Sequence, residues 1–180
     1  MTGGMMRLLL FSALLLLSAP TSAAVVSASP NGFHVRHSVQ MVVPPAESFR
    51  TFGQIGSWWS KQHTYSGDSG NLSLSLQPGG CFCERLPGGG GMEHMRVVYV
   101  DPGKRIILTG SLGPLLYEAT TGVMDVQFER IAGGSKVTID YKAAGFAEGG
   151  GDRMAPLVDA VIGEQVNRYR LFARTGRSPR

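Results

Sequence analysis

Regular alternation of apolar and polar residues in the second half of the chain is the feature that most constrains its fold. Residues 123–130 place an apolar side chain at every second position from Met124, and residues 137–141 repeat the pattern after Gly133-Gly134. Successive side chains of a strand point to opposite faces, so the pattern predicts two strands joined by a glycine hairpin loop. One face of each strand is apolar and the other polar, which is typical of an antiparallel sheet buried on one face only.

Shorter strand-like segments precede this hairpin, and turn sequences separate them. The expected strands cover 33–43, 72–76, 81–86, 93–100 and 105–112. The clearest turn is Asp101-Pro102-Gly103-Lys104, with proline and glycine where a tight turn requires them. Many of the 25 glycines lie in such turns. Strands with turns at this short spacing predict an antiparallel meander.

Three segments are helical in pattern. Pro44-Pro45 ends the first strand, and residues 45–53 predict a short helix with proline in its first turn. A second short helix or turn covers 55–60. Residues 154–172 carry apolar side chains at three- and four-residue spacing, which predicts a long amphipathic helix that ends near Gly176. Only the sheet can cover its apolar face, so the expected fold is α+β, with a curved antiparallel sheet of about six to seven strands.

The N-terminus has the pattern of a secretory signal peptide. Arg7 precedes an apolar run from Leu8 to Leu17, and small residues at 21–24 follow. The run is well short of the ~20 residues that span a bilayer, so we interpret residues 1–24 as a cleaved signal rather than a retained anchor. We expect a flexible N-terminus at 25–32, one domain at 33–175, a flexible tail at 176–180 and no transmembrane segment after cleavage. The expected location is periplasmic or secreted.

Composition and motifs exclude several functions. The formal net charge of +4 is too small and too scattered to predict a nucleic-acid partner. Export removes ATP and NAD from the expected partners, and we expect no cofactor. The sequence has no Gly-x-Ser-x-Gly, P-loop or His-Glu-x-x-His motif, which argues against hydrolase or kinase chemistry.

The order of elements resembles the helix-grip fold of the START-like proteins, also called SRPBCC or polyketide-cyclase-like proteins. Segments 49–59, 79–84 and 97–106 resemble the branch related to activators of the heat-shock chaperone ATPase. The resemblance covers residues 33–175. It implies a cavity between the curved sheet and the long helix, which in relatives binds lipids, sterols or other apolar molecules. Chaperone activation is not expected of an exported protein, which meets neither that cytosolic chaperone nor ATP.

Such a cavity would recruit part of the aromatic and soft apolar residues, although most of these belong to a core by base rate. Trp58 or Trp59 is the residue we expect near the entrance. The expected ligand-binding residues are Phe52, Trp58, Trp59, Phe82, Glu84, Tyr99, Met124, Phe128, Tyr141, Val158 and Ile162.

Glu84 is the candidate polar group of the cavity. It lies between Phe82 and Leu86 in the alternation, so it faces inward if they do. A buried carboxylate needs a partner or a raised pKa, which makes Glu84 a candidate anchor for a ligand. An internal salt bridge with Arg96 or Arg105 is at least as good an interpretation.

The four histidines have no mutual spacing that suits a metal ion, and no metal is expected. His34 and His37 are three apart on a strand and should face opposite sides, and His94 should point away from its neighbour Glu93. His63 follows the tryptophan pair in a loop expected near the cavity mouth. Each histidine is more readily a surface or hydrogen-bonded group than a base, and His63 is the first to test.

Cys81 and Cys83 are the only cysteines. Two strand positions this close would hold their Cα atoms near the ~6.8 Å upper limit for a disulfide, and a structural zinc ion would need two further ligands. We therefore rank two unpaired or packed thiols first, a strained disulfide second and a metal site last.

Three functional hypotheses follow. The leading one is an exported START-like domain that binds a small hydrophobic molecule or lipid without transforming it. The second is an enzyme of the cyclase or dehydratase kind, with Glu84 and His63 as acid and base, which requires both groups to line one cavity. The third is a protein-interaction module that uses the outer sheet face or the long helix to bind a protein partner.

Overall fold

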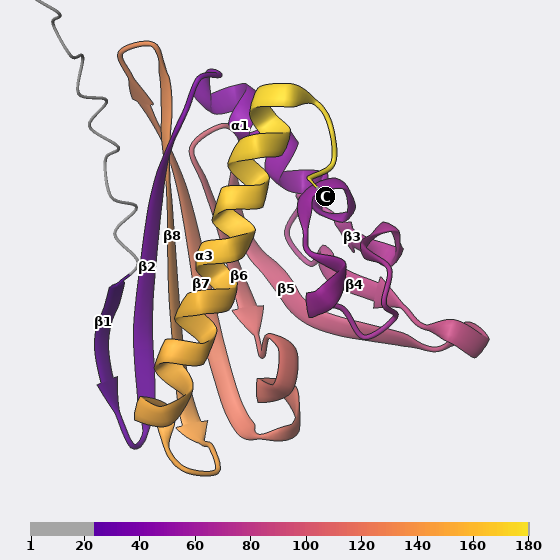
Figure 1. The fold of residues 1–180 in the computed structure, drawn as a ribbon, viewed down its shortest axis with the longest axis vertical. Helices are drawn as coiled ribbons and strands as arrows, with labels where there is room; N and C mark the ends of the chain where they lie inside the picture. Colours follow the sequence, from indigo (N-terminus) through magenta and orange to yellow (C-terminus); the bar gives the residue numbers. More distant parts are fainter. Residues whose placement is uncertain (1–23, 180) are drawn as a thin grey trace, which may run out of the picture.

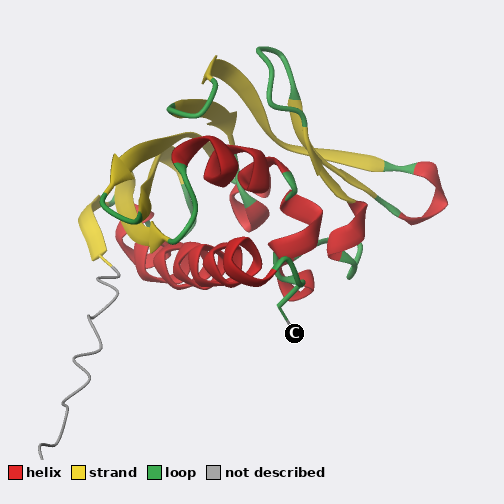
Figure 2. Cartoon of the chain, turned by 90° about the horizontal axis from the view of Figure 1, so that it is seen from above, coloured by secondary structure: helices red, strands yellow, loops and turns green. Residues whose placement is uncertain are grey.

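The computed structural model describes residues 24–179, which form an antiparallel sheet with helices on its concave face (Figures 1 and 2). The sheet has eight strands in the order β1-β2-β8-β7-β6-β5-β4-β3. The strands are β1 (Ala24–Ser29), β2 (Gly32–Met41), β3 (Leu72–Leu74), β4 (Cys81–Arg85), β5 (Gly91–Asp101), β6 (Arg105–Gly110), β7 (Ala119–Ile131) and β8 (Gly134–Phe146). The helices are α1 (Pro45–Gly53), α2 (Ile55–Trp58) and α3 (Gly151–Thr175), with short 3₁₀ turns η1 (Lys61–His63), η2 (Ser69–Asn71), η3 (Pro87–Gly89) and η4 (Gly113–Tyr117).

This architecture confirms the expected α+β helix-grip fold, including the two short helices after a long strand and the long C-terminal helix. The sheet has eight strands rather than the six to seven expected, because β1 adds an edge strand. Gly176 ends α3 with a left-handed φ of 65°, as predicted. Met124, Val126 and Phe128 of β7 all lie on the buried face, as the alternation requires.

The N-terminal segment differs from the prediction. Residues 25–32 were expected to be flexible, but β1 pairs with β2 along the edge of the sheet, for example Val25 with Val35. Val25 and Val26 are adjacent apolar residues, so this segment lacks the alternation that predicts a strand, and both side chains are exposed. Backbone hydrogen bonds hold it in place, and these leave no residue pattern.

The expected signal peptide at 1–24 lies outside the described residues apart from Ala24, where β1 begins. Among residues 24–179, no helix has both the length and the apolar composition needed to cross a bilayer.

The core lies between the inner sheet face and the helices. Ile162, Val166 and Tyr169 of α3 are buried against it. The ring of Trp58 lies 5.2 Å from that of Tyr169 and 5.5 Å from that of Phe52, and its Nε1 donates to the carbonyl of Thr51. This aromatic cluster joins α1 and α2 to α3.

The β3–β4–β5 end of the sheet is not covered by α3, which packs mainly against β2 and β1 at the other end. Figure 1 shows β4 and β5 extending away from the helix. Register shifts interrupt the ladders at Phe82/Cys83 and at Val97/Tyr99. Such bulges bend and twist strands, so the sheet diverges from α3 towards this end.

Candidate ligand pocket

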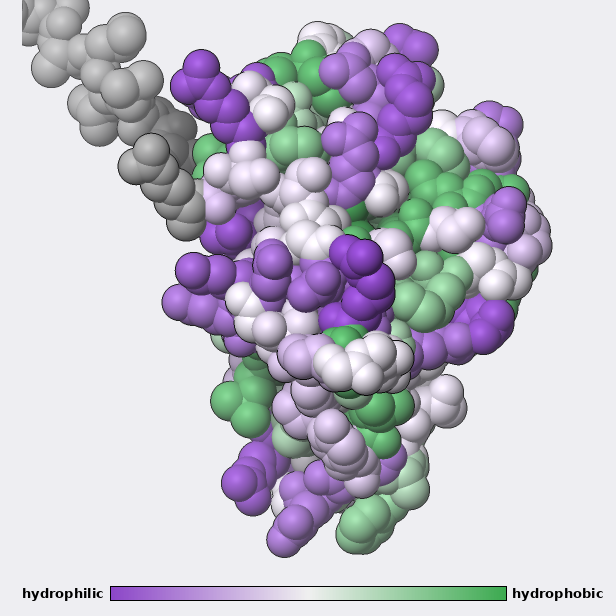
Figure 3. Space-filling model, turned by 90° about the vertical axis from the view of Figure 1, so that its right-hand side faces the viewer, coloured by the Kyte–Doolittle hydropathy of each residue, from purple (hydrophilic) through white to green (hydrophobic). Residues whose placement is uncertain are grey.

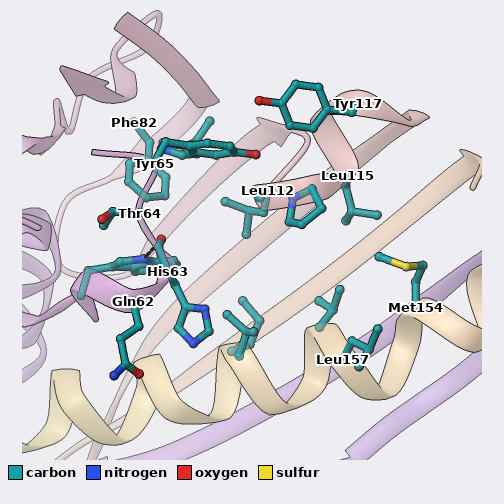
Figure 4. Close-up of a pocket in the computed structure, with 17 residues that line it drawn as sticks. Gln62, His63, Thr64, Tyr65, Phe82, Leu112, Leu115, Tyr117, Met154 and Leu157 are labelled. Atoms are coloured by element: carbon teal, nitrogen blue, oxygen red, sulfur yellow. Dashed lines mark hydrogen bonds between the residues drawn. The ribbon is translucent and has the colours of Figure 1, made fainter. Parts of the chain in front are cut away.

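A pocket of about 410 Å³ occupies the space where the sheet and α3 diverge (Figure 4). Its volume is within the usual ~300–1,000 Å³ range of small-molecule sites. The lining is mainly apolar and comes from four parts of the chain: Trp59, Gln62, His63, Thr64 and Tyr65; Phe82 and His94; Leu112, Gly113, Pro114, Leu115 and Tyr117; and Met154, Leu157, Val158, Val161 and Ile162.

Helical spacing explains the wall that α3 provides. Met154, Leu157, Val158 and Val161 recur at three or four residues and so share a face of the helix. Ile162 is 3 % exposed and joins this wall to the core, whereas Leu157 is 58 % exposed and lies at the mouth.

The η4 turn between β6 and β7 forms the wall opposite α3. In Figure 4, Leu112, Leu115 and Tyr117 face the helix across the cavity. Leu115 is buried, and its carbonyl accepts a hydrogen bond from Thr120 Oγ1. Tyr117 is 73 % exposed, so it borders the opening.

The sheet end of the pocket is aromatic. The ring of Phe82 lies 4.9 Å from the imidazole of His94 and 5.4 Å from the ring of Trp59. Tyr65 lies 5.9 Å from His94 and 6.1 Å from Tyr117, between centroids. Burial and the nearby Tyr117 and Glu84 raise the pKa of Tyr65 to about 12, so its hydroxyl is protonated at neutral pH.

Behind His94 lies a buried carboxylate. Glu84 is 1 % exposed; one carboxylate oxygen accepts a hydrogen bond from Ser66 N at 2.5 Å, and the other lies 2.9 Å from His94 Nε2. Burial alone would raise the pKa of Glu84, but the hydrogen bonds from Ser66, Tyr65 and His94 outweigh it and lower that pKa. Burial also lowers the pKa of His94, although Glu84 opposes this effect. The ordinary state is therefore a carboxylate beside a neutral imidazole.

His63 lies at the cavity wall, near the tryptophan pair, as the sequence predicted. Its Nε2 is 3.0 Å from Glu164 of α3, and its carbonyl accepts a hydrogen bond from Trp59 Nε1 at 2.9 Å. The contact with Glu164 connects the 59–65 segment to α3, and the hydrogen bond from Trp59 lies within the segment.

Four of the residues expected to bind ligand line this pocket, namely Trp59, Phe82, Val158 and Ile162. The others lie elsewhere. Phe52, Trp58, Met124 and Phe128 belong to the packed core, where α1, α2 and α3 cover the sheet. Tyr141 is fully buried, and its hydroxyl is 3.4 Å from Leu112 N, behind the pocket wall.

Tyr99 is 45 % exposed and pairs with Ile107 of β6. The register shift between Val97 and Tyr99 disrupts the alternation, so Tyr99 lies outside the core that buries Val97.

The partner of Glu84 is His94, and not Arg96 or Arg105, the two residues considered for a salt bridge. Arg96 pairs with Glu93, and Arg105 pairs with Asp125 at 2.7 Å. Glu84 is buried as expected, but it is separated from the cavity by His94 and is not among the lining residues. The acid–base hypothesis required Glu84 and His63 to line one cavity, and this arrangement is not present.

His34 and His37 face opposite sides of β2, as predicted. His34 Nε2 is 2.5 Å from Asp140 of β8, and His37 Nε2 is 2.8 Å from Asp159 of α3. Both histidines have structural partners away from the pocket.

The two cysteines form a disulfide, so the first-ranked expectation of unpaired thiols was wrong. Their Cα atoms are only 5.3 Å apart, closer than the extended strand assumed for them would allow. Opposite them, β5 contains a bulge at His94, because Phe82 pairs with Met95 and Cys83 with Glu93. A Glu93 carboxylate oxygen lies within 4.8 Å of both sulfurs, but bonded sulfurs offer no thiolate to a metal ion.

Sequence reasoning missed His94 and the η4 wall. The helical spacing of 154–162 could have identified Leu157 and Val161 as neighbours of Val158 and Ile162. No local pattern marks Gly113–Tyr117 as a wall, since its sequence is that of a turn.

Apolar side chains on the face shown in Figure 3 occur in patches between hydrophilic ones. The protein-interaction hypothesis stays a prediction.

No protein-family model matches the sequence, and no curated protein is similar enough to count as a relative. Several solved structures share the fold. An uncharacterised protein from Rhizobium leguminosarum matches with a TM-score of 0.55 and 19 % identity, over 82 % of this chain and 97 % of that one. DynU16, encoded in the dynemicin biosynthetic locus, matches with a TM-score of 0.59 and 17 % identity, over 81 % of this chain and 48 % of its own. CalU16 from Micromonospora echinospora matches with a TM-score of 0.51 and 10 % identity, over 81 % of this chain and 78 % of its own. Identities this low show a common fold and no more.

Proposed function

We propose that the protein binds a small hydrophobic molecule in the pocket between α3 and the β4–β5 end of the sheet, without transforming it. The observation that carries this proposal is an open cavity of about 410 Å³ with apolar walls on both sides. Small-molecule sites are typically apolar clefts of this size with a few polar groups, which is the character of this cavity.

The walls suit a flat or elongated apolar ligand. Aliphatic side chains of α3 and η4 provide opposite sides, and Trp59, Phe82 and Tyr65 provide an aromatic end. Burial of apolar ligand surface contributes about 25 cal/mol per Å², so contact with both walls would supply most of the affinity. The fold shared with DynU16 and CalU16 is compatible with a ligand-binding domain.

Filling the cavity should weaken binding. We expect Val161→Trp, which places a large side chain in the α3 wall, to weaken binding of the hydrophobic probe N-phenyl-1-naphthylamine by about tenfold or more, through loss of cavity volume. Probe fluorescence would measure the dissociation constant.

The matched control is Ala160→Trp, which puts the same side chain on the exposed face one residue away. This variant should bind the probe like the unmodified protein. Equal binding by all three proteins would place the probe outside the cavity and contradict the proposal, as would the absence of binding to the unmodified protein.

We also propose that the protein is exported, with residues 1–24 removed. The Cys81–Cys83 disulfide supports this, because disulfides persist mainly in oxidising compartments such as the periplasm. The resemblance to the chaperone-activator branch stays a prediction.

A further inference from the structure

Among the described residues that line the pocket, His94 is the one polar residue that is buried. It is 5 % exposed, whereas Gln62, His63, Thr64 and both lining tyrosines are half-buried or exposed. A ligand that fills the aromatic end would therefore meet a single polar group shielded from water. Such a group can select a ligand, because a buried donor or acceptor left unpaired is costly.

Glu84 determines which nitrogen of His94 carries the proton. Both side chains are almost fully buried, and Glu84 Oε1 already accepts the hydrogen bond from Ser66 N. An ionised carboxylate can only accept hydrogen bonds, so the 2.9 Å contact with Oε2 requires His94 Nε2–H to donate. In the neutral imidazole the other nitrogen, Nδ1, is then an acceptor with a free lone pair.

No residue among 24–179 has a hydrogen bond to Nδ1. Gln165 Nε2 is the one fully buried side-chain nitrogen or oxygen in this range that lacks a partner. Since His94 Nδ1 also lacks a partner, it is not fully buried and can be reached from outside the protein. Since His94 lines the pocket, the cavity is where a partner for Nδ1 can enter. The rings of Phe82 and Tyr65 lie against the imidazole and restrict its movement.

We propose that His94 Nδ1 is the hydrogen-bond acceptor of the pocket and that the ligand is an apolar molecule carrying a hydroxyl group, whose O–H donates to Nδ1. Glu84 is a positioning residue that holds the acceptor tautomer. This inference rests on the proposed function and names the class of ligand.

A pair of probes that differ only at the oxygen tests it. 2-Naphthol offers a hydroxyl donor, and 2-methoxynaphthalene has the same ring system but no donor. We expect the unmodified protein to bind 2-naphthol about 5- to 10-fold more tightly, which is the range of one hydrogen bond. Dissociation constants would come from naphthalene fluorescence or titration calorimetry.

The double variant Glu84→Gln/His94→Phe removes the acceptor while keeping an aromatic ring beside Phe82 and an oxygen for Ser66 N. We expect it to bind the two probes with equal affinity, close to that of the unmodified protein for 2-methoxynaphthalene. His34→Phe is the matched control, because His34 also pairs with a carboxylate but lies outside the pocket. It should retain the preference for 2-naphthol.

Glu84→Gln alone tests the positioning role. With its oxygen held by Ser66 N, the new amide would present its NH₂ to His94 Nε2 and favour the opposite tautomer, with the proton on Nδ1. We expect the preference for 2-naphthol to fall to about equal binding while 2-methoxynaphthalene still binds. A purely structural role would weaken both probes equally, which would overturn this assignment.

The remaining outcomes separate the two proposals. If the unmodified protein binds both probes equally, or if the double variant keeps the preference, the role of His94 is overturned and the binding pocket stands. If the unmodified protein binds neither probe, both proposals fail.

Discussion

Glu84 and His94 form a buried polar pair in an otherwise apolar part of the molecule. His94 Nε2 and one Glu84 oxygen bond to each other, and Ser66 N donates to the second carboxylate oxygen. Removal of one partner would leave the other buried without a hydrogen bond, at a cost of about 1–3 kcal/mol, and more if it is charged. The pair therefore contributes to the stability of the fold as well as to the chemistry of the pocket.

The pair should make stability depend on pH. The pKa of folded His94 is below its ordinary value of 6.5, so the unfolded chain binds the proton first as pH falls. Its contribution to the free energy of unfolding is complete above pH 6.5 and decreases below it, by at most about 1.4 kcal/mol per pH unit. The pKa of Glu84 is also lowered in the folded protein, so its contribution to the free energy of unfolding likewise decreases as pH falls below its ordinary pKa of 4.5.

Urea unfolding at a series of pH values between 7.5 and 5.5 would measure this effect. The difference in unfolding free energy between the unmodified protein and Glu84→Gln/His94→Phe should shrink as pH falls, since the other histidines are common to both. Parallel curves for the two proteins would show that His94 has an ordinary pKa.

At the scale of elements, the close approach of α3 to β2 determines where the helix lies. A Cβ atom on Gly163 would come within 2.9 Å of the imidazole of His37, and His37 in turn contacts Asp159 one turn earlier in the helix. A larger side chain at 163 would push the helix away from the sheet.

We therefore expect Gly163→Leu to lower the free energy of unfolding by about 1–3 kcal/mol through overpacking, despite the better helix propensity of leucine. Chemical denaturation followed by far-UV circular dichroism would measure the change. Ala160→Leu, on the exposed side of the same helix, should change stability by no more than about 0.5 kcal/mol. A Gly163→Leu protein as stable as this control would contradict the close-packing explanation.

At the scale of the whole molecule, the pocket results from the sheet being wider than the part of it that α3 covers. The sheet has eight strands, and α3 covers mainly the β1–β2 end. The 59–65 segment and η4 partly cover the rest, which leaves the cavity between them and the helix. Figure 2 shows the sheet curving over this group of helices.

The proposed export also concerns the whole chain. We expect the protein isolated from its own cells to occur in the periplasmic or secreted fraction and to begin at Val25, because small residues precede this position. N-terminal sequencing and intact-mass measurement of each fraction would check this. A full-length chain that starts at Met1 in the membrane fraction would instead support the retained anchor.

The sequence by itself determined the order of elements and the buried face of most of them. Alternation and helical spacing are local properties, so β7, β8 and the apolar side of α3 could be predicted from them, as could the burial of Glu84. Only part of the pocket followed, through Trp59, Phe82, Val158 and Ile162.

Only the tertiary structure determined which side chains pair with one another. The pairing of Glu84 with His94 and the Cys81–Cys83 bond both lie at the bulge that His94 makes in the β4–β5 ladder, which residue patterns do not mark. The division of the aromatic residues between core and cavity depends on how far α3 extends over the sheet. These features arise from contacts between segments distant in the chain, which the periodicity within a single segment does not predict.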